Sequence, residues 1–311
     1  MAFDSTAPST AQQSRADGRP TPIDEAVERE FNLRPRHPER QSVYAGFGER
    51  SAAFRAATPG ALLDRRYGDG PRALLDVFPA GAGAPVLLFI HGGYWRTLDK
   101  ELFSFLAAPY VAAGVTVVMP NYDLAPSVPL ARIAEQMHQA LAWLRAAAPS
   151  FGADAARIVL SGHSAGGHLA ALTTLAGGAA GEPGGGGDIR GIVPVSGLFD
   201  LVPLLRTSIN RDARLSPADA DALSPLRLAR RLPALPAVPL RLLVGGGETA
   251  GFQQQSRDFL EVWRSRGGSG ELLLAPGRTH FTVLESLADP AGPVFKDILG
   301  FLEAPSSHRG A

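Results

Sequence analysis

A serine between two glycines is the residue of this sequence best suited to nucleophilic chemistry. It lies in Gly162-His163-Ser164-Ala165-Gly166, a Gly-x-Ser-x-Gly pattern typical of a strained turn between a strand and a helix. The chain contains 35 glycines, so the pattern alone could be a glycine-rich connection with an incidental serine. Its surroundings favour the first interpretation, because an apolar segment, residues 157–161, precedes the turn and residues 165–175 form a helical pattern after it. We therefore predict that Ser164 is a nucleophile.

A serine hydroxyl needs a base that removes its proton, and the chain has seven histidines. Where such a turn follows a buried parallel strand, the acid and then the histidine come later in the chain. Three histidines therefore lie too early: His37, His91 and His138. His163 and His168 belong to the turn and its helix, where we expect packing or hydrogen-bonding roles, and His308 lies in a polar terminal segment. His280 follows the last predicted strand, and we predict that it is the base.

An acid is needed to orient this histidine, and Glu248 is our prediction for it. Glu248 follows the seventh predicted strand through Gly245-Gly246-Gly247, the place where the acid is expected. The competitor is Asp200, which follows the sixth predicted strand, and the alternative role for Glu248 is an exposed loop carboxylate. Asp258 lies well inside the next predicted helix and is expected to be a solvated surface residue.

Backbone N–H groups usually stabilise the oxyanion that forms when a serine attacks a carbonyl carbon. The segment His91-Gly92-Gly93-Tyr94-Trp95 follows the third predicted strand, and its glycines permit a backbone that turns N–H groups toward the site. We predict that the donors are the N–H groups of Gly93, Tyr94 and Ala165. His91 is expected to hold this loop through hydrogen bonds.

These residues must be positioned by a mostly parallel sheet with helices on both faces, because strand-like and helix-like segments alternate along the chain. Short apolar segments predict eight strands: Leu62–Tyr67, Ala73–Phe78, Val86–Ile90, Val115–Met119, Ile158–Leu160, Ile192–Val195, Leu240–Val244 and Leu272–Ala275. The first two are joined by a short turn that suits a hairpin. The main helices are predicted at Glu101–Ala113, Leu130–Ala147, Ala165–Leu175 and Phe252–Arg266.

The chain divides into one catalytic unit and smaller terminal segments. Residues 1–20 are polar with few large apolar side chains and are predicted to be disordered. Residues 21–60 have a weak helical pattern, broken at Arg34–Pro38, and are predicted to form an N-terminal helical cap or arm. The catalytic domain is predicted over residues 61–303, followed by a flexible tail at 304–311.

Composition limits the possible partners. The 30 basic and 30 acidic residues cancel, which argues against a nucleic acid or an anionic membrane as partner and favours a small-molecule substrate. The chain has no cysteine, so it has no thiolate metal site, and its 311 residues include neither a signal-like start nor an apolar segment of about 18 residues. We expect a cytoplasmic protein that binds no membrane. The sequence leaves open whether it forms a homodimer.

The motifs together resemble the arylformamidase, or kynurenine formamidase, branch of the α/β-hydrolases, which is related to hormone-sensitive-lipase-like esterases. The resemblance includes a His-Gly-Gly-x-Trp loop at His91–Trp95, a Gly-His-Ser-Ala-Gly-Gly-His elbow at Gly162–His168 and the turn Asn121–Pro126. It continues in Thr207–Asn210, Leu223–Pro225 and Phe252–Ser256, and it extends from about Glu28 to Leu302.

This resemblance implies an α/β-hydrolase fold and hydrolysis through an acyl-serine intermediate, with no metal or organic cofactor. The implied substrates are aryl formamides such as N-formylkynurenine or small esters. Two positions depart from the family pattern: Glu248 stands where the acid is commonly aspartate, and Gly251 falls where relatives often carry glutamate.

Two other functions are weighed against a formamidase. A short-chain or aryl carboxylesterase would use the same residues, because both reactions pass through the same kind of oxyanion. A hydrolase-fold binding protein without activity is the third, and a complete set of Ser164, Glu248 and His280 argues against it. A flat aromatic substrate would suit a pocket built from four aromatic residues near the catalytic segments, and burial in the core is the equal alternative for them: Tyr94, Trp95, Phe252 and Phe281.

Overall fold

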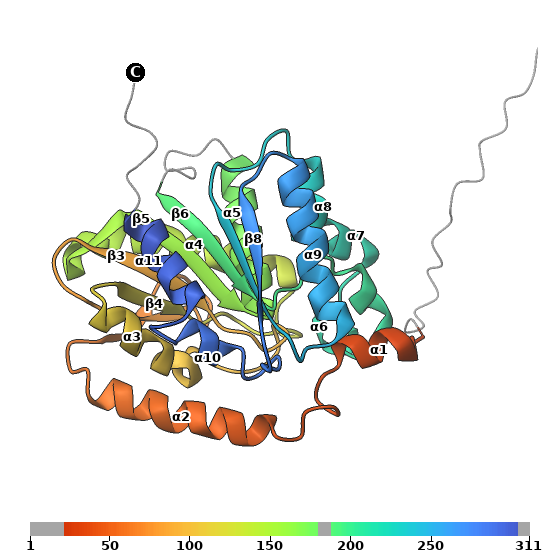
Figure 1. Ribbon diagram of the computed structural model, residues 1–311, viewed down its shortest axis with the longest axis horizontal. Coiled ribbons are helices and arrows are strands. Elements are labelled where there is room, and N and C mark those ends of the chain that lie inside the picture. The colour runs from red at the N-terminus through yellow and green to blue at the C-terminus, as the bar shows by residue number, and fades with distance from the viewer. Residues whose placement is uncertain (1–21, 180–187, 304–311) are drawn as a thin grey trace, which may run out of the picture.

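A single sheet of eight strands organises the computed structural model, which describes residues 22–179 and 188–303. The predicted segments 1–20 and 304–311 lie outside the described residues. The strands are β1 (Leu62–Arg66), β2 (Leu74–Phe78), β3 (Ala84–Ile90), β4 (Thr116–Pro120), β5 (Ala153–His163), β6 (Ile189–Val195), β7 (Leu240–Gly245) and β8 (Gly270–Ala275). Their order across the sheet is β1-β2-β4-β3-β5-β6-β7-β8 (Figure 1).

Most neighbouring strands run parallel. Strand β2 pairs antiparallel with both β1 and β4, and the remaining pairs from β4 to β8 are parallel. The predicted eight-stranded, mostly parallel sheet and its opening hairpin are thus confirmed. Because the carboxyl ends of parallel strands meet at one edge of the sheet, the segments that follow β3 to β8 gather at that edge.

The helices cover both faces of the sheet. They are α1 (Glu25–Phe31), α2 (Arg40–Ala56), α3 (Ala107–Ala112), α4 (Leu130–Ala147), α5 (Ala165–Ala179), α6 (Asn210–Ala213), α7 (Pro217–Ala222), α8 (Pro225–Arg231), α9 (Ala250–Ser265), α10 (Leu284–Leu287) and α11 (Pro293–Glu303). Three 3₁₀ helices accompany them: η1 (Lys100–Leu106), η2 (Ala148–Phe151) and η3 (Val202–Arg206).

Alternate residues of the central strands face opposite layers. In β3, Val86, Leu88 and Ile90 pack in one core with residues of α4, α5, α8 and α9. Leu87 and Phe89 pack in the other core with residues of α2, η1, α3, α10 and α11. Because these strands are buried on both faces, their sequences are continuously apolar, which is why they could be predicted.

The predicted helix Glu101–Ala113 is two elements in the structure, η1 followed by α3. The physical reason is Pro109, which has no N–H and so cannot donate to the carbonyl of Phe105. The proline instead lies in the first turn of α3, where an N–H would have no intrahelical partner.

The N-terminal arm consists of α1 and α2, separated near Pro35 and Pro38 as the sequence predicts. Helix α1 begins at Asp24, whose carboxylate accepts from the N–H groups of Ala26 and Val27 at 3.0 and 3.3 Å. It packs against α9 and η3, whereas α2 packs against η1 along the lower edge in Figure 1. The link between the two helices therefore leads from the α9 side of the molecule to the η1 side.

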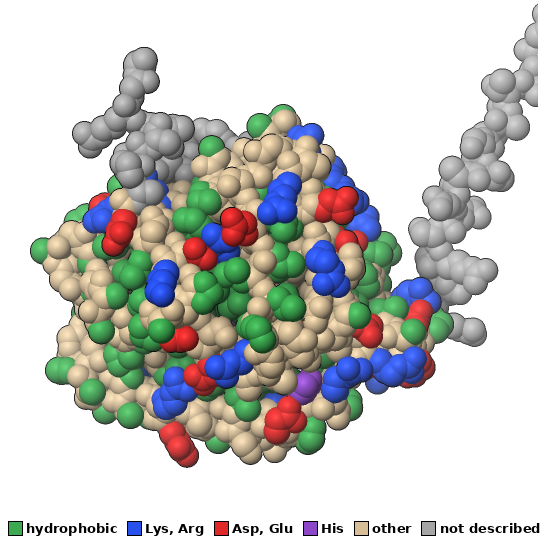
Figure 2. Space-filling view, in the orientation of Figure 1, with side chains coloured by type: hydrophobic (Ala, Val, Ile, Leu, Met, Phe, Trp, Pro, Cys, Tyr) green, Lys and Arg blue, Asp and Glu red, His purple; other side chains and the backbone are tan. Residues whose placement is uncertain are grey.

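The surface view shows basic and acidic side chains interspersed on this face (Figure 2), in keeping with the balanced charge of the chain. Within residues 22–179 and 188–303, no helix is long and apolar enough to cross a membrane.

Candidate active site

Ser164 lies in a sharp turn between β5 and α5. Its φ of 57° is in the left-handed region, and its N–H donates to Val195 O at 2.8 Å. The flanking glycines are required by space: a Cβ on Gly162 would lie 2.3 Å from Gly166 O, and one on Gly166 would lie 2.0 Å from Ile90 O. The turn therefore places the hydroxyl at the carboxyl edge of the sheet, at the cost of backbone strain.

His280 and Glu248 are held together in the loops that follow β8 and β7. The Nδ1 atom of His280 lies 2.7 Å from Glu248 Oε2, and both side chains are almost completely buried. The other carboxylate oxygen, Oε1, accepts from Ser196 Oγ at 2.5 Å and from the N–H of Gly245 at 2.6 Å. These donors fix the position of the carboxylate beside Nδ1, and the carboxylate in turn orients the imidazole.

Ser164 and His280 line the same cavity. Among the hydrogen bonds of the described residues there is none between Ser164 Oγ and His280, a contact that often forms fully only when substrate is bound. His163 supports the base from below: its Nε2–H donates to His280 O at 2.8 Å. Burial lowers the pKa of His163 well below its usual value, so this neighbour stays neutral.

Asp200, the competing acid, lies elsewhere. Its carboxylate accepts from Arg227, with Nε at 3.0 Å and Nη2 at 3.2 Å, and its backbone carbonyl accepts from Gln255. The structure thus brings Glu248, and not Asp200, to His280.

The predicted oxyanion loop lies against the nucleophile. A Cβ on Gly92 would lie 3.1 Å from Ser164 Cβ, and Gly93 has a φ of 111°, at which a Cβ would lie 2.2 Å from Thr97 O. Tyr94 also has a positive φ of 50°. Within the described residues, the N–H groups of Gly93, Tyr94 and Ala165 donate to no protein acceptor. They are therefore available to an oxyanion formed at Ser164.

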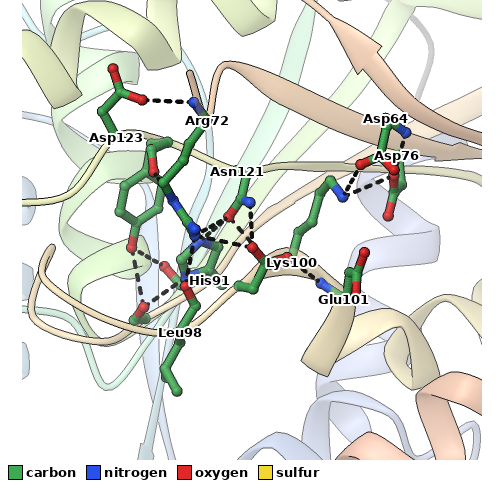
Figure 3. Close-up of polar contacts among 12 residues, drawn as sticks. Asp64, Arg72, Asp76, His91, Leu98, Lys100, Glu101, Asn121 and Asp123 are labelled. Atoms are coloured by element: carbon green, nitrogen blue, oxygen red, sulfur yellow. Dashed lines mark hydrogen bonds and ion pairs between the residues drawn. The ribbon is translucent and has the colours of Figure 1, made fainter. Parts of the chain in front are cut away.

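A buried network holds this loop from behind (Figure 3). His91 Nε2 lies 2.9 Å from Asn121 Oδ1 and Nδ1 lies 2.7 Å from Gly92 O, while the ring stacks on Tyr122 at 4.3 Å. Burial lowers the pKa of His91 to about 4, so the ring is neutral and donates to only one of the two oxygens. The hydroxyl of Tyr122 donates to the carbonyls of His91 and Gly92, at 2.9 and 3.1 Å. The predicted structural role of His91 is thus consistent with its contacts.

Arg72 is part of this network, although sequence reasoning missed it. Its Nη2 donates to Leu98 O at 2.8 Å and to Asn121 Oδ1 at 3.0 Å, and its Nε donates to Tyr122 O at 3.0 Å (Figure 3). An arginine in a predicted hairpin turn gives no local signal of a role 50 residues away in the chain.

Ser196 is the second residue that sequence reasoning missed. It directly follows β6 and has a φ of 49°, and its Oγ points at Glu248. We expect Ser196→Ala to lower kcat/KM about tenfold, because the carboxylate loses one of its charge-assisted hydrogen bonds. Steady-state kinetics and a melting curve should be measured beside Ser161→Ala, which removes a similarly buried hydroxyl that donates to Val193 O at 2.7 Å. Equal losses of activity in both variants would contradict a specific role for Ser196.

The cavity above Ser164 has a volume of about 240 Å³. Of the four aromatic residues predicted as pocket candidates, Tyr94 and Phe281 line it. Trp95 and Phe252 do not, because both are completely buried in the core: Trp95 packs edge-on against His168 at 5.1 Å, and Phe252 packs against His280 at 4.4 Å. Phe252 thus supports the base from the core side.

Potential metal ligands are not grouped in this region. Over residues 22–179 and 188–303, no cluster of three or more His, Asp or Glu side chains could hold a metal ion.

Comparison with known proteins relates most of the chain to hydrolases. Residues 87–284 match the profile of a family described as having the alpha/beta hydrolase fold. A kynurenine formamidase of Salmo salar is 31% identical over 235 residues, which cover 73% of this chain and 77% of the relative. The esterase LipC of Mycobacterium tuberculosis is 31% identical over 280 residues, covering 78% of this chain and 67% of LipC.

A solved structure shares both fold and sequence with the chain. It is a protein of Silicibacter sp. TM1040, described provisionally as a thioesterase, with a TM-score of 0.77 and 32% identity. The match covers 89% of this chain and 99% of that protein.

Proposed function

The chain belongs to the α/β-hydrolase family and, within it, to the branch that contains the kynurenine formamidases; from this premise we propose that it is a serine hydrolase that uses Ser164, His280 and Glu248. Its substrates are small formamides or small esters, since its relatives include a kynurenine formamidase and an esterase. The observation that most supports the assignment of residues is the buried Glu248–His280 pair, with Nδ1 and Oε2 2.7 Å apart, in which His280 lines the same cavity as Ser164.

In the proposed mechanism, Ser164 Oγ attacks the carbonyl carbon while His280 Nε2 takes the hydroxyl proton. Glu248 accepts a hydrogen bond from His280 Nδ1–H and stabilises the imidazolium that forms. The N–H groups of Gly93, Tyr94 and Ala165 donate to the oxyanion of the tetrahedral intermediate. His280 then gives its proton to the departing amine or alcohol, which leaves an acyl-Ser164 intermediate. A water molecule, deprotonated by His280, attacks this ester. His280 then gives that proton to Ser164 Oγ as the acyl–oxygen bond breaks, which releases the acid and restores the serine.

An aryl formamide such as N-formylkynurenine is the substrate class we propose first, because kynurenine formamidases of Salmo salar, Danio rerio and Drosophila melanogaster are among the relatives, at 31, 28 and 26% identity. A short-chain or aryl carboxylesterase is the second candidate, since LipC is also 31% identical to the chain over the aligned residues. The same residues serve both reactions, so the site geometry alone does not separate them. An inactive binding protein is disfavoured by the complete set of catalytic groups.

The deciding experiment compares kcat/KM for N-formylkynurenine and p-nitrophenyl acetate in the same buffer. We expect turnover of both, with the formamide used at least as efficiently although an amide carbonyl is intrinsically less reactive than an activated ester. A negligible rate on the formamide beside a robust rate on the ester would overturn the first proposal in favour of the second.

We also propose that the enzyme acts on a dissolved small molecule without an organic cofactor. The mixed charges of the surface support this over a nucleic-acid or membrane partner (Figure 2). The cytoplasmic location and the homodimer stay predictions from the sequence.

A further inference from the structure

The N-terminal arm forms one wall of the cavity above Ser164. Six of the lining residues come from the link between α1 and α2 and from the first turns of α2: Asn32, Leu33, Arg34, Arg40, Gln41 and Tyr44. Two contacts join the arm to the loops that contain catalytic groups. Tyr94 Oη donates to Phe31 O at 2.6 Å, and the Tyr44 ring packs edge-on against Phe281 at 5.7 Å. Any group that leaves Ser164 through this opening passes the arm.

The charges of the cavity wall are one-sided. Its lining includes Arg34, Arg40 and Arg96 and no carboxylate. Arg96 forms an ion pair with Asp212, so its charge is largely compensated. Glu39, which precedes Arg40 in the chain, has a hydrogen-bond partner of its own: its Oε1 lies 2.7 Å from His37 Nδ1. Basic side chains are visible near the link between α1 and α2, at the lower right of Figure 2.

Arg34 and Arg40 differ in how they are held. Arg34 is exposed, and its side chain makes no hydrogen bond or ion pair with the described residues. Arg40 Nη1 donates to the carbonyls of Arg34 and His37, at 2.8 and 3.0 Å, which holds the link in place. Burial raises the pKa of the Tyr44 hydroxyl to about 12, and the charges of Arg34 and Arg40 oppose this rise. Arg34, Arg40 and Tyr44 all line the cavity, so two guanidinium groups and a hydroxyl donor belong to the same wall.

We propose that Arg34 and Arg40 form a subsite that selects substrates carrying a carboxylate on the leaving group. The inference rests on the proposed serine hydrolase function and deepens it. In a formamide or an acetate ester the acyl part is small and neutral, so a negative charge must lie on the group that leaves. Guanidinium groups suit a carboxylate because they donate two parallel hydrogen bonds to its oxygens. N-formylkynurenine bears such a carboxylate, as do acetate esters of hydroxybenzoates in which the phenol oxygen is acylated.

The test uses a pair of esters that differ in one charge: 4-acetoxybenzoate and its methyl ester. For each variant, the ratio of kcat/KM for the charged ester to that for the neutral ester is divided by the wild-type ratio, which cancels the intrinsic reactivities of the two esters. We expect Arg34→Gln to lower this ratio about three- to fivefold, a value set by solvent screening of an exposed pair. Arg34→Gln combined with Arg40→Gln should lower it about tenfold.

Arg36→Gln is the matched control, because Arg36 is an exposed arginine of the same link that does not line the cavity. This variant should keep the wild-type ratio. In the wild type, raising the salt concentration from about 0.05 to 0.5 M should lower the ratio, whereas the double variant should change little.

Two results would overturn the subsite: an unchanged ratio in Arg34→Gln and the double variant, or an equal fall in Arg36→Gln. Neither outcome bears on the proposed function, which has its own test. That test is whether the wild-type protein hydrolyses the neutral methyl ester and the Ser164→Ala protein does not. If the wild-type protein hydrolysed neither ester, that result would instead contradict the proposed serine hydrolase function.

Discussion

The Ser164→Ala protein should fold normally and lose hydrolysis of both N-formylkynurenine and p-nitrophenyl acetate, with kcat falling by about 10⁴-fold or more. The reason is that alanine has no hydroxyl, so the elbow beside the oxyanion loop loses the attacking oxygen. The chain has no cysteine, Ser196 Oγ donates to Glu248, and Ser161 Oγ donates to Val193 O. The substitution removes no hydrogen bond of the Ser164 side chain within the described residues, so the melting temperature should change little.

A fluorophosphonate probe provides a second measurement of the same prediction. The wild-type protein should be labelled, and mass spectrometry of the digested protein should locate the label on the peptide that contains Ser164. The alanine variant should not be labelled. Unchanged hydrolysis by Ser164→Ala, or labelling of it at the wild-type rate, would reject the proposed mechanism.

The Glu248→Gln protein should lose about 10³- to 10⁴-fold in kcat, the second largest effect we expect. The carboxylate accepts hydrogen bonds from three directions: His280 Nδ1, Ser196 Oγ and the N–H of Gly245. A glutamine amide has one acceptor oxygen, so its NH₂ group must face either the imidazole or the other two donors. If it faces His280, the imidazole is forced into the tautomer with its proton on Nε2, which cannot accept the proton of Ser164.

Asp200→Asn is the matched control for this variant, since Asp200 is the other carboxylate that the order along the chain allows. Its partners are Arg227 and the N–H of Val202 rather than His280, so this substitution should leave kcat within about twofold and lower stability by at most about 1 kcal/mol. If kcat fell strongly in Asp200→Asn and not in Glu248→Gln, the assignment of the acid would be wrong.

Much of the fold could be predicted because its strands and main helices have strong local patterns. The helix predicted at Leu130–Ala147 is found with these bounds as α4, since its apolar residues recur at helical spacing and Pro129 precedes it. Helix α11 was not predicted, although Pro293 at its start and the buried Val294, Ile298 and Leu302 follow the same rules. The elements between β6 and β7 were not predicted either, because they are only four to seven residues long, too short for a periodic pattern.

The catalytic candidates could be named from the sequence because chain order limits the choice. Parallel strands bring their carboxyl ends to one edge, so a residue that follows one strand is expected near a residue that follows its neighbour. This argument selected Ser164 and His280, and it left Glu248 and Asp200 as alternatives. It could not find Ser196 or Arg72, because a serine at a strand end and an arginine in a turn are common residues in common places.

The sequence by itself determined which residues follow each strand along the chain and the elbow around Ser164, because both follow from local patterns of apolar residues and glycines. What only the tertiary structure decided is which side chains meet there. Glu248 reaches His280 while Asp200 pairs with Arg227, Trp95 and Phe252 enter the core while Tyr94 and Phe281 line the cavity, and the arm brings Arg34 and Arg40 to its wall. These contacts depend on packing between segments far apart in the chain, and local sequence contains no record of the distances between them.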